Sequence, residues 1–225
     1  MARFARVIVP GIAYHIVDRG NRRNDVFFSE ADKHLYMQLL RKNGERFGIS
    51  YLAYCLMDNH VHLVAIPRSR ESFAKAMAEI KRKYTAIMNF KNGWSGKLWQ
   101  GRFGSFPMDE PHLYSAVRYV ERNPVRARMV GRAEDFQWSS AKAHVAGQDD
   151  PHLPLLDSGK ILAIKNWADY LHDPDDEEFL ATVRKLGRTG RPLGSEGFIK
   201  TLELLTGRAL APRTRGKART ALFPA

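Results

Sequence analysis

The sequence lacks several features that would assign it to other classes of protein. It has one cysteine, Cys55, so neither an internal disulfide nor a CxxC metal motif can form, which fits a reducing cytoplasm. No apolar run approaches transmembrane length, and Pro10 and Gly11 interrupt the apolar segment near the N-terminus. The HExxH motif of helical zinc proteases is also missing. These absences predict a cytoplasmic protein without a membrane partner.

Acidic residues are scarce as well, and the charges are unevenly distributed. The 225 residues include 36 Lys and Arg against 24 Asp and Glu, a net charge of +12. Residues 1–133 carry a net +12, residues 134–178 a net −8 and residues 179–225 a net +8. Two separate basic blocks favour a nucleic-acid partner over an ordinary solvated surface. We expect a main domain at 1–133, an acidic helical appendage at 134–180, and a basic helical segment with a disordered tail at 181–225.

Two histidines one residue apart, His60 and His62, occupy a run that otherwise reads as a buried strand. Side chains at i and i+2 of a strand share a face, so the two imidazoles should project side by side and form half of a metal site. The upstream run 50–57 is also strand-like, and Asp58-Asn59 is typical of a hairpin turn. The spacing alone leaves metal ligand and sheet histidine equally open. For His15, on an earlier strand at 12–19, packing within the sheet is favoured over a role beside the pair.

The order of the elements predicts the fold class. Strand, helix, strand, strand, helix, strand and helix patterns follow one another from Ile12 to Pro124. This order matches an α+β, ferredoxin-like (split βαβ) antiparallel sheet with helices packed on it, extended by a last helix that begins after Asp109. A mainly helical C-terminal appendage should follow.

That last helix carries the second half of the candidate site. At 100° per residue, Tyr119 lies about 110° from the buried stripe and Asn123 about 40° from Tyr119, so both share one flank. A tyrosine, two histidines and a carboxamide in basic surroundings are the parts needed to break a phosphodiester. Tyr119 would be the nucleophile, and His60, His62 and the Asn123 oxygen would hold Mg²⁺ or Mn²⁺. The alternative for Tyr119 is an ordinary, partly buried aromatic residue.

Basic and aromatic side chains along the same region are candidates for DNA contacts. Each has a simpler explanation, as a solvated loop or helix face or, for Trp99, as a packing plug that is at least as probable as base stacking. The candidates are Arg19, Arg22, Arg23, Lys81, Arg82, Lys83, Trp99, Arg102, Arg122 and Arg126.

The motifs, taken in order, resemble the single-tyrosine HUH (IS200-like) transposases, and in particular their REP-associated branch in bacterial chromosomes. They are Asn59-His60-Val61-His62-Leu63, Leu98-Trp99-Gln100, Arg118 to Ala127 and Trp138-Ser139-Ser140-Ala141. The resemblance runs from about Tyr14 to His144. It implies cleavage and rejoining of single-stranded DNA at hairpins of REP/BIME-type repeats through a 5′-phosphotyrosine on Tyr119, with His60, His62 and Asn123 as metal ligands. It also implies a nucleoid-associated protein that acts as a monomer or homodimer.

Two other functions stay open at the level of sequence. One is a non-catalytic protein that binds structured DNA, against which the intact His60, His62 and Tyr119 argue. The other is a relaxase-like or replication-initiator-like HUH endonuclease, against which the absence of a helicase domain and of a second tyrosine suited to catalysis near Tyr119 argues. The basic tail from Pro212 to Arg219 would add sequence-independent affinity for nucleic acid.

Overall fold

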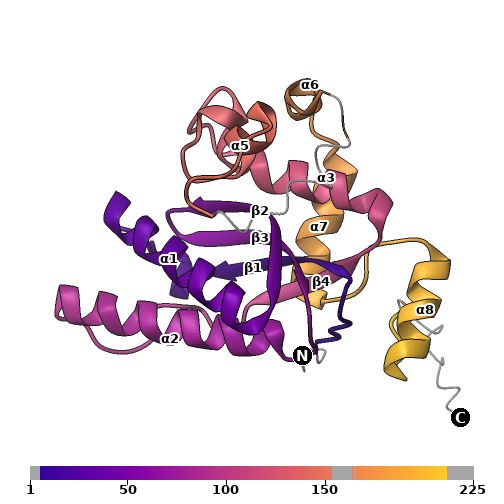
Figure 1. Ribbon diagram of the computed structural model, residues 1–225, viewed down its shortest axis with the longest axis horizontal. Helices are drawn as coiled ribbons and strands as arrows, with labels where there is room; N and C mark the ends of the chain where they lie inside the picture. Colours follow the sequence, from indigo (N-terminus) through magenta and orange to yellow (C-terminus); the bar gives the residue numbers. More distant parts are fainter. Residues whose placement is uncertain (1–5, 154–163, 165, 212–225) are drawn as a thin grey trace, which may run out of the picture.

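A four-stranded antiparallel sheet organises the protein, as seen in a computed structural model that describes residues 6–153, 164 and 166–211 (Figure 1). The strands are β1 (Ala13–Arg19), β2 (Ile49–Met57), β3 (His60–Pro67) and β4 (Gly104–Met108), in the order β2-β3-β1-β4. The Asp58-Asn59 turn joins β2 to β3, as the sequence predicted. The predicted ferredoxin-like fold class is confirmed.

Helices cover both faces of this sheet. The helices α1 (Glu30–Phe47) and α2 (Ser72–Asn92) lie side by side, and Phe73 of α2 packs edge-on against Tyr14 of β1. The next residue of β1, His15, contacts Tyr119 of α3 (Glu110–Glu121) instead. Because neighbouring side chains of a strand point to opposite faces, α2 and α3 lie on opposite sides of the sheet (Figure 1).

The acidic segment after residue 133 is attached directly to this core. It contains the 3-10 turn η2 (Ala133–Asp135) and the helices α5 (Ala141–Ala146) and α6 (Trp167–His172). Backbone hydrogen bonds from Leu56 to Trp138 and from Ser140 to Tyr54 extend the edge of β2. The fully buried Glu121 of α3 accepts hydrogen bonds from His144 Nδ1 at 2.5 Å and Trp167 Nε1 at 2.8 Å. These bonds hold α5 and α6 against α3.

The remaining elements follow the chain ends. α4 (Asn123–Arg126) continues α3 after a short break, α7 (Glu177–Thr189) packs beside β4, and α8 (Glu196–Thr206) lies away from the sheet (Figure 1). Leu202 of α8 packs with Val7 and Leu210 in a small cluster of its own. The predicted basic tail lies outside the described residues. Among the helices of the described part, none has the length and apolar character needed to cross a membrane.

Candidate active site

The histidine pair lies on the face of the sheet that α3 covers. In the pairing of β1 with β3, His60 is opposite Arg19 and His62 is opposite Val17, so both imidazoles project on the side of His15. The two rings have centroids 4.9 Å apart, and the His62 ring lies 5.7 Å from that of Tyr119. His62 and Tyr119 line a cavity of about 550 Å³. The structure therefore brings the predicted nucleophile and one predicted ligand together.

His15 belongs to the site, although sequence reasoning favoured a packing role. Its side chain is almost fully buried, as that reasoning expected, but its Nε2 lies 2.8 Å from Nδ1 of His62 and its ring 5.7 Å from that of Tyr119. The alternation of β1 placed His15 on one face with Val17. No pattern in the sequence predicts the register that sets Val17 opposite His62.

The hydrogen bonds determine which nitrogen each histidine can offer to a ligand. Asn59 Nδ2 donates to the Arg23 carbonyl at 3.2 Å, so its Oδ1 faces His60 Nδ1, 2.5 Å away. A carboxamide oxygen only accepts, so His60 carries its proton on Nδ1 and keeps a lone pair on Nε2. Contact with His15 likewise occupies Nδ1 of His62. The Nε2 lone pair of His60 is therefore free to bind a metal, and Nε2 of His62 has a free lone pair when His62 donates its Nδ1 proton to His15.

Burial keeps these imidazoles neutral. It lowers the pKa of His60 to about 4, with the positive charge of Arg19 as a smaller cause, and it lowers the pKa of His62 well below the ordinary value. Burial also lowers the pKa of His15 to about 3. Metal ions bind the neutral imidazole, so the electrostatics of the site suit metal coordination near neutral pH.

Tyr119 is held by a well-defined helix. The carboxylate of Asp109 accepts the backbone N–H of His112 at 3.3 Å at the start of α3, and Val117 and Val120 bury the inner face. Tyr119 is 8% exposed, and the Arg126 guanidinium lies 4.4 Å from its ring centroid. Arg126 also donates a hydrogen bond to the Tyr119 carbonyl. A fixed positive charge thus lies against the aromatic ring.

Asn123 begins α4, close to the tyrosine backbone. Its Nδ2 donates to the Tyr119 carbonyl at 3.3 Å, which leaves Oδ1 as the atom suited to a metal. Asn123 and His60 are not among the residues that line the cavity. Among the described residues, no group of three or more His, Cys, Asp and Glu side chains is arranged to hold a metal. A three-ligand site at this position would therefore need the carboxamide, and two neutral imidazoles with one carboxamide are suitable donors for a divalent ion.

The predicted DNA-contacting residues divide into two sets. Arg19, Arg23 and Arg102 line the cavity. On α2, Lys81 instead forms an ion pair with Asp18 at 2.8 Å, while Arg82 and Lys83 pair with Glu79. Arg22, exposed in the 3-10 turn η1 (Asn21–Arg23), is not among the residues that line the cavity.

Trp99 is buried in the protein, which was the alternative to base stacking. The side chain is 4% exposed and packs against the rings of Tyr36 and Tyr84, with the Lys81 ammonium 5.4 Å from its ring. A base cannot stack on a ring that is covered in this way. The tryptophan instead fixes the loop that leads to Arg102.

The acidic segment engages Arg122 and Arg126. Asp175 lies 3.0 Å from Arg122 Nε and 3.5 Å from Arg126 Nη1, and the two arginine side chains are only 12% and 14% exposed. Arg118 donates to the carbonyls of Asp173 and Pro174. Arg122 and Arg126 were predicted to contact DNA, but in the structure both guanidinium groups are already paired with the Asp175 carboxylate.

Comparisons with known proteins identify the family of this chain and support its fold. The sequence profile of a family described as "Transposase IS200 like" matches residues 8–123. A REP-associated tyrosine transposase of Escherichia coli (strain K12) is 23% identical over 148 residues, which cover 65% of this chain and 86% of that protein. A solved structure of a REP-associated tyrosine transposase bound to a REP hairpin is similar in fold. It has a TM-score of 0.56 and 21% identity, and the match covers 65% of this chain and 86% of that one.

Proposed function

We propose, because this chain belongs to the IS200-like transposase family, that it cleaves and rejoins single-stranded DNA at hairpins with Tyr119 as the nucleophile. Members of this family are DNA endonucleases and strand transferases. The observation that carries the assignment is the cavity in which Tyr119 and His62 meet, with ring centroids 5.7 Å apart and arginines around them. A polyanionic substrate, a nucleophile and a candidate metal ligand would converge there.

The proposed reaction exchanges one phosphoester for another. The Tyr119 phenol loses its proton as its oxygen attacks the scissile phosphorus, and the bond from phosphorus to the 3′ oxygen breaks. The leaving oxygen takes up a proton, so the products are a free 3′-OH and a 5′-phosphotyrosine. A second 3′-OH reverses the step and joins strands without a nucleotide cofactor. The Arg126 guanidinium against the ring stabilises the negative charge that the phenol oxygen acquires.

His60, His62 and Asn123 would hold a divalent ion, Mg²⁺ or Mn²⁺, at this site. Such an ion supplies a Lewis acid that withdraws charge from the phosphate. The residues of the chain prepare the site: Asn59 holds the proton of His60 on Nδ1 and so leaves the Nε2 lone pair free, and His15 holds the ring of His62. The Nδ2 atom of Asn123 donates to the Tyr119 carbonyl, which leaves Oδ1 as the atom that would bind the ion.

We further propose that the substrate is a REP-type hairpin and that Tyr119 acts within its own subunit. Hairpin binding is supported by the similarity to the REP-associated transposases. Action in cis is supported by the contact of Tyr119 with His15 and His62 of the same chain. A monomer then contains every residue of the proposed site.

The test is adduct formation on a labelled REP hairpin in the presence of Mn²⁺. We expect a covalent protein–DNA species that survives denaturation, and we expect Tyr119→Phe to abolish it while hairpin binding persists. Tyr114→Phe, on the same helix, is the matched control and should retain the adduct. Hairpin binding with no adduct in the wild-type protein would instead identify a non-catalytic DNA-binding protein.

A further inference from the structure

The helix α7 forms one wall of the candidate active site, although it lies outside the region that matches the transposase family. Four of its residues, Val183, Arg184, Gly187 and Arg188, line the same cavity as His62 and Tyr119. Their spacing of i, i+1, i+4 and i+5 places them on one side of the helix. The family match ends at residue 123. The C-terminal region of this chain therefore contributes side chains to the catalytic pocket.

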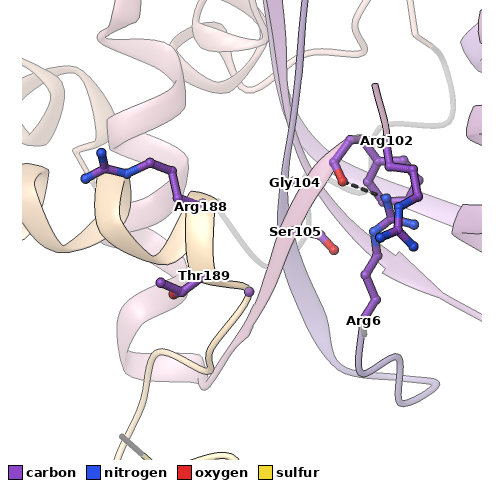
Figure 2. Close-up of a pocket in the computed structure, with 9 residues that line it drawn as sticks. Arg6, Arg102, Gly104, Ser105, Arg188 and Thr189 are labelled. Atoms are coloured by element: carbon purple, nitrogen blue, oxygen red, sulfur yellow. Dashed lines mark hydrogen bonds between the residues drawn. The ribbon is translucent and has the colours of Figure 1, made fainter. Parts of the chain in front are cut away.

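Tight packing fixes this helix against the sheet. Leu180 and Val183 are buried, and α7 contacts both β4 and β1. A Cβ atom at Gly104 would lie 2.4 Å from the carbonyl oxygen of Gly187, so only glycine allows so close an approach. Figure 2 shows the end of α7, with Arg188 and Thr189, beside Gly104 and Ser105 of β4. The backbone of α7, from which Arg184 and Arg188 project, is thus held in place against the sheet.

The charge around the cavity suits a phosphate chain. Its lining includes the five arginines 19, 23, 102, 184 and 188, and its one carboxylate, Asp18, is 3% exposed and paired with Lys81. Arg184 and Arg188 are exposed, and within the described part of the chain neither has an ion-pair partner. Arg122 and Arg126, by contrast, are paired with Asp175. The arginines of α7 are therefore better placed to receive an external anion.

We propose that α7 is a substrate-binding element, in which Arg184 and Arg188 bind backbone phosphates of the single DNA strand beside the scissile phosphate. This inference rests on the proposed function and assigns part of its substrate site to the C-terminal region. Guanidinium groups bind phosphate oxygens without reading bases, so the contact positions the strand and is independent of sequence. Because α7 is packed tightly against the sheet, its position sets the distance between these phosphates and Tyr119.

The test compares three single substitutions that each remove one positive charge. Arg184→Ala and Arg188→Ala alter the side of α7 that faces the cavity, whereas Lys185→Ala alters an exposed residue roughly 130° from the centre of that side. All are made in the Tyr119→Phe protein, so that binding is measured without cleavage. The probe is a fluorescent REP hairpin, with or without a single-stranded 5′ flank, and anisotropy is recorded over a range of salt concentrations.

We expect each arginine variant to bind the flanked hairpin more weakly. A fourth protein that combines Arg184→Ala with Arg188→Ala should lose about tenfold or more in affinity at moderate salt. The slope of log affinity against log salt should become shallower by about 0.7 for each phosphate that the variant no longer binds. Lys185→Ala should match the parent protein, and the stem without a flank should show little difference among variants. Thermal unfolding checks that all variants stay folded.

Two outcomes would overturn the inference. In the first, Arg184→Ala and Arg188→Ala behave like Lys185→Ala; in the second, the losses are equal with and without the flank, which would place the contact on the duplex stem. Neither outcome affects the proposed function, which depends on the adduct that the wild-type protein forms at Tyr119. If the wild-type protein forms the adduct but the arginine variants bind the hairpin as well as the parent protein does, only the substrate-binding role of α7 is rejected.

Discussion

The two faces of the β-sheet bury different kinds of side chain. On the side of α1 and α2, Tyr14, Ile16 and Leu63 are at most 1% exposed and pack with residues such as Phe73. On the side of α3 and α7, His15, His62 and Tyr119 are buried almost as deeply, at 2%, 4% and 8% exposure. Burying apolar groups stabilises the fold, whereas burying imidazoles costs free energy. The first face, called the apolar face below, therefore stabilises the fold. The second, called the site face, costs part of that stability and holds His15, His62 and Tyr119 in place.

Removing a large side chain from the apolar face should have the largest effect on stability. Phe73→Ala leaves a cavity against Tyr14 and should lower the free energy of unfolding by about 3–5 kcal/mol, measured by urea denaturation. Phe90→Ala, on the same helix but 93% exposed, is the control and should change it by less than about 0.5 kcal/mol. Similar losses for both variants would show that this face does not carry the stability assigned to it.

A change on the site face should instead affect metal binding. Asn59→Ala removes the acceptor that fixes the proton of His60, so the affinity for Mn²⁺, measured by calorimetry without DNA, should fall by about 10- to 100-fold. Asn92→Ala removes an amide that bonds the Met88 carbonyl on α2 and should leave the affinity unchanged. Wild-type affinity in the Asn59 variant would contradict the assigned role of the hydrogen bond.

The buried histidines should make stability depend on pH. A folded-state pKa of about 3 for His15, against 6.5 when exposed, means that the unfolded chain takes up the proton first as the pH falls. The contribution is complete above pH 6.5 and is lost progressively toward pH 3. His15→Asn should therefore reduce the fall in unfolding free energy between pH 7 and 5.5 by about 1 kcal/mol. An unchanged pH slope in urea titrations would count against a buried neutral His15.

The parts of the molecule that the sequence predicted are those governed by local periodicity. The β2–β3 hairpin, the cap at Asp109 and the buried stripe of α3 follow from spacing and turn chemistry, and they place His60, His62 and Tyr119. The contacts that complete the site depend on pairing between distant segments. The register that joins His15 to His62, and the approach of Gly187 to Gly104, leave no periodic signal.

Charge patterns were a weaker guide than periodicity for the same reason. Arg122 and Arg126 stand in a basic cluster along the sequence, yet both form ion pairs with Asp175, some fifty residues later. No sequence motif singles out Arg184 and Arg188, but both residues line the cavity. Whether an arginine meets its partner inside the chain or outside is decided by tertiary packing.

We propose that Tyr119, on the face of the sheet that holds His15 and His62, is the residue that becomes covalently attached to DNA. The most direct measurement is mass spectrometry of the protein after incubation with a REP hairpin and Mn²⁺, followed by nuclease and protease digestion. We expect a nucleotide phosphate on the peptide that contains Tyr119, attached at Tyr119 itself. A nucleotide on another residue of the same protein, such as Tyr114, would contradict it.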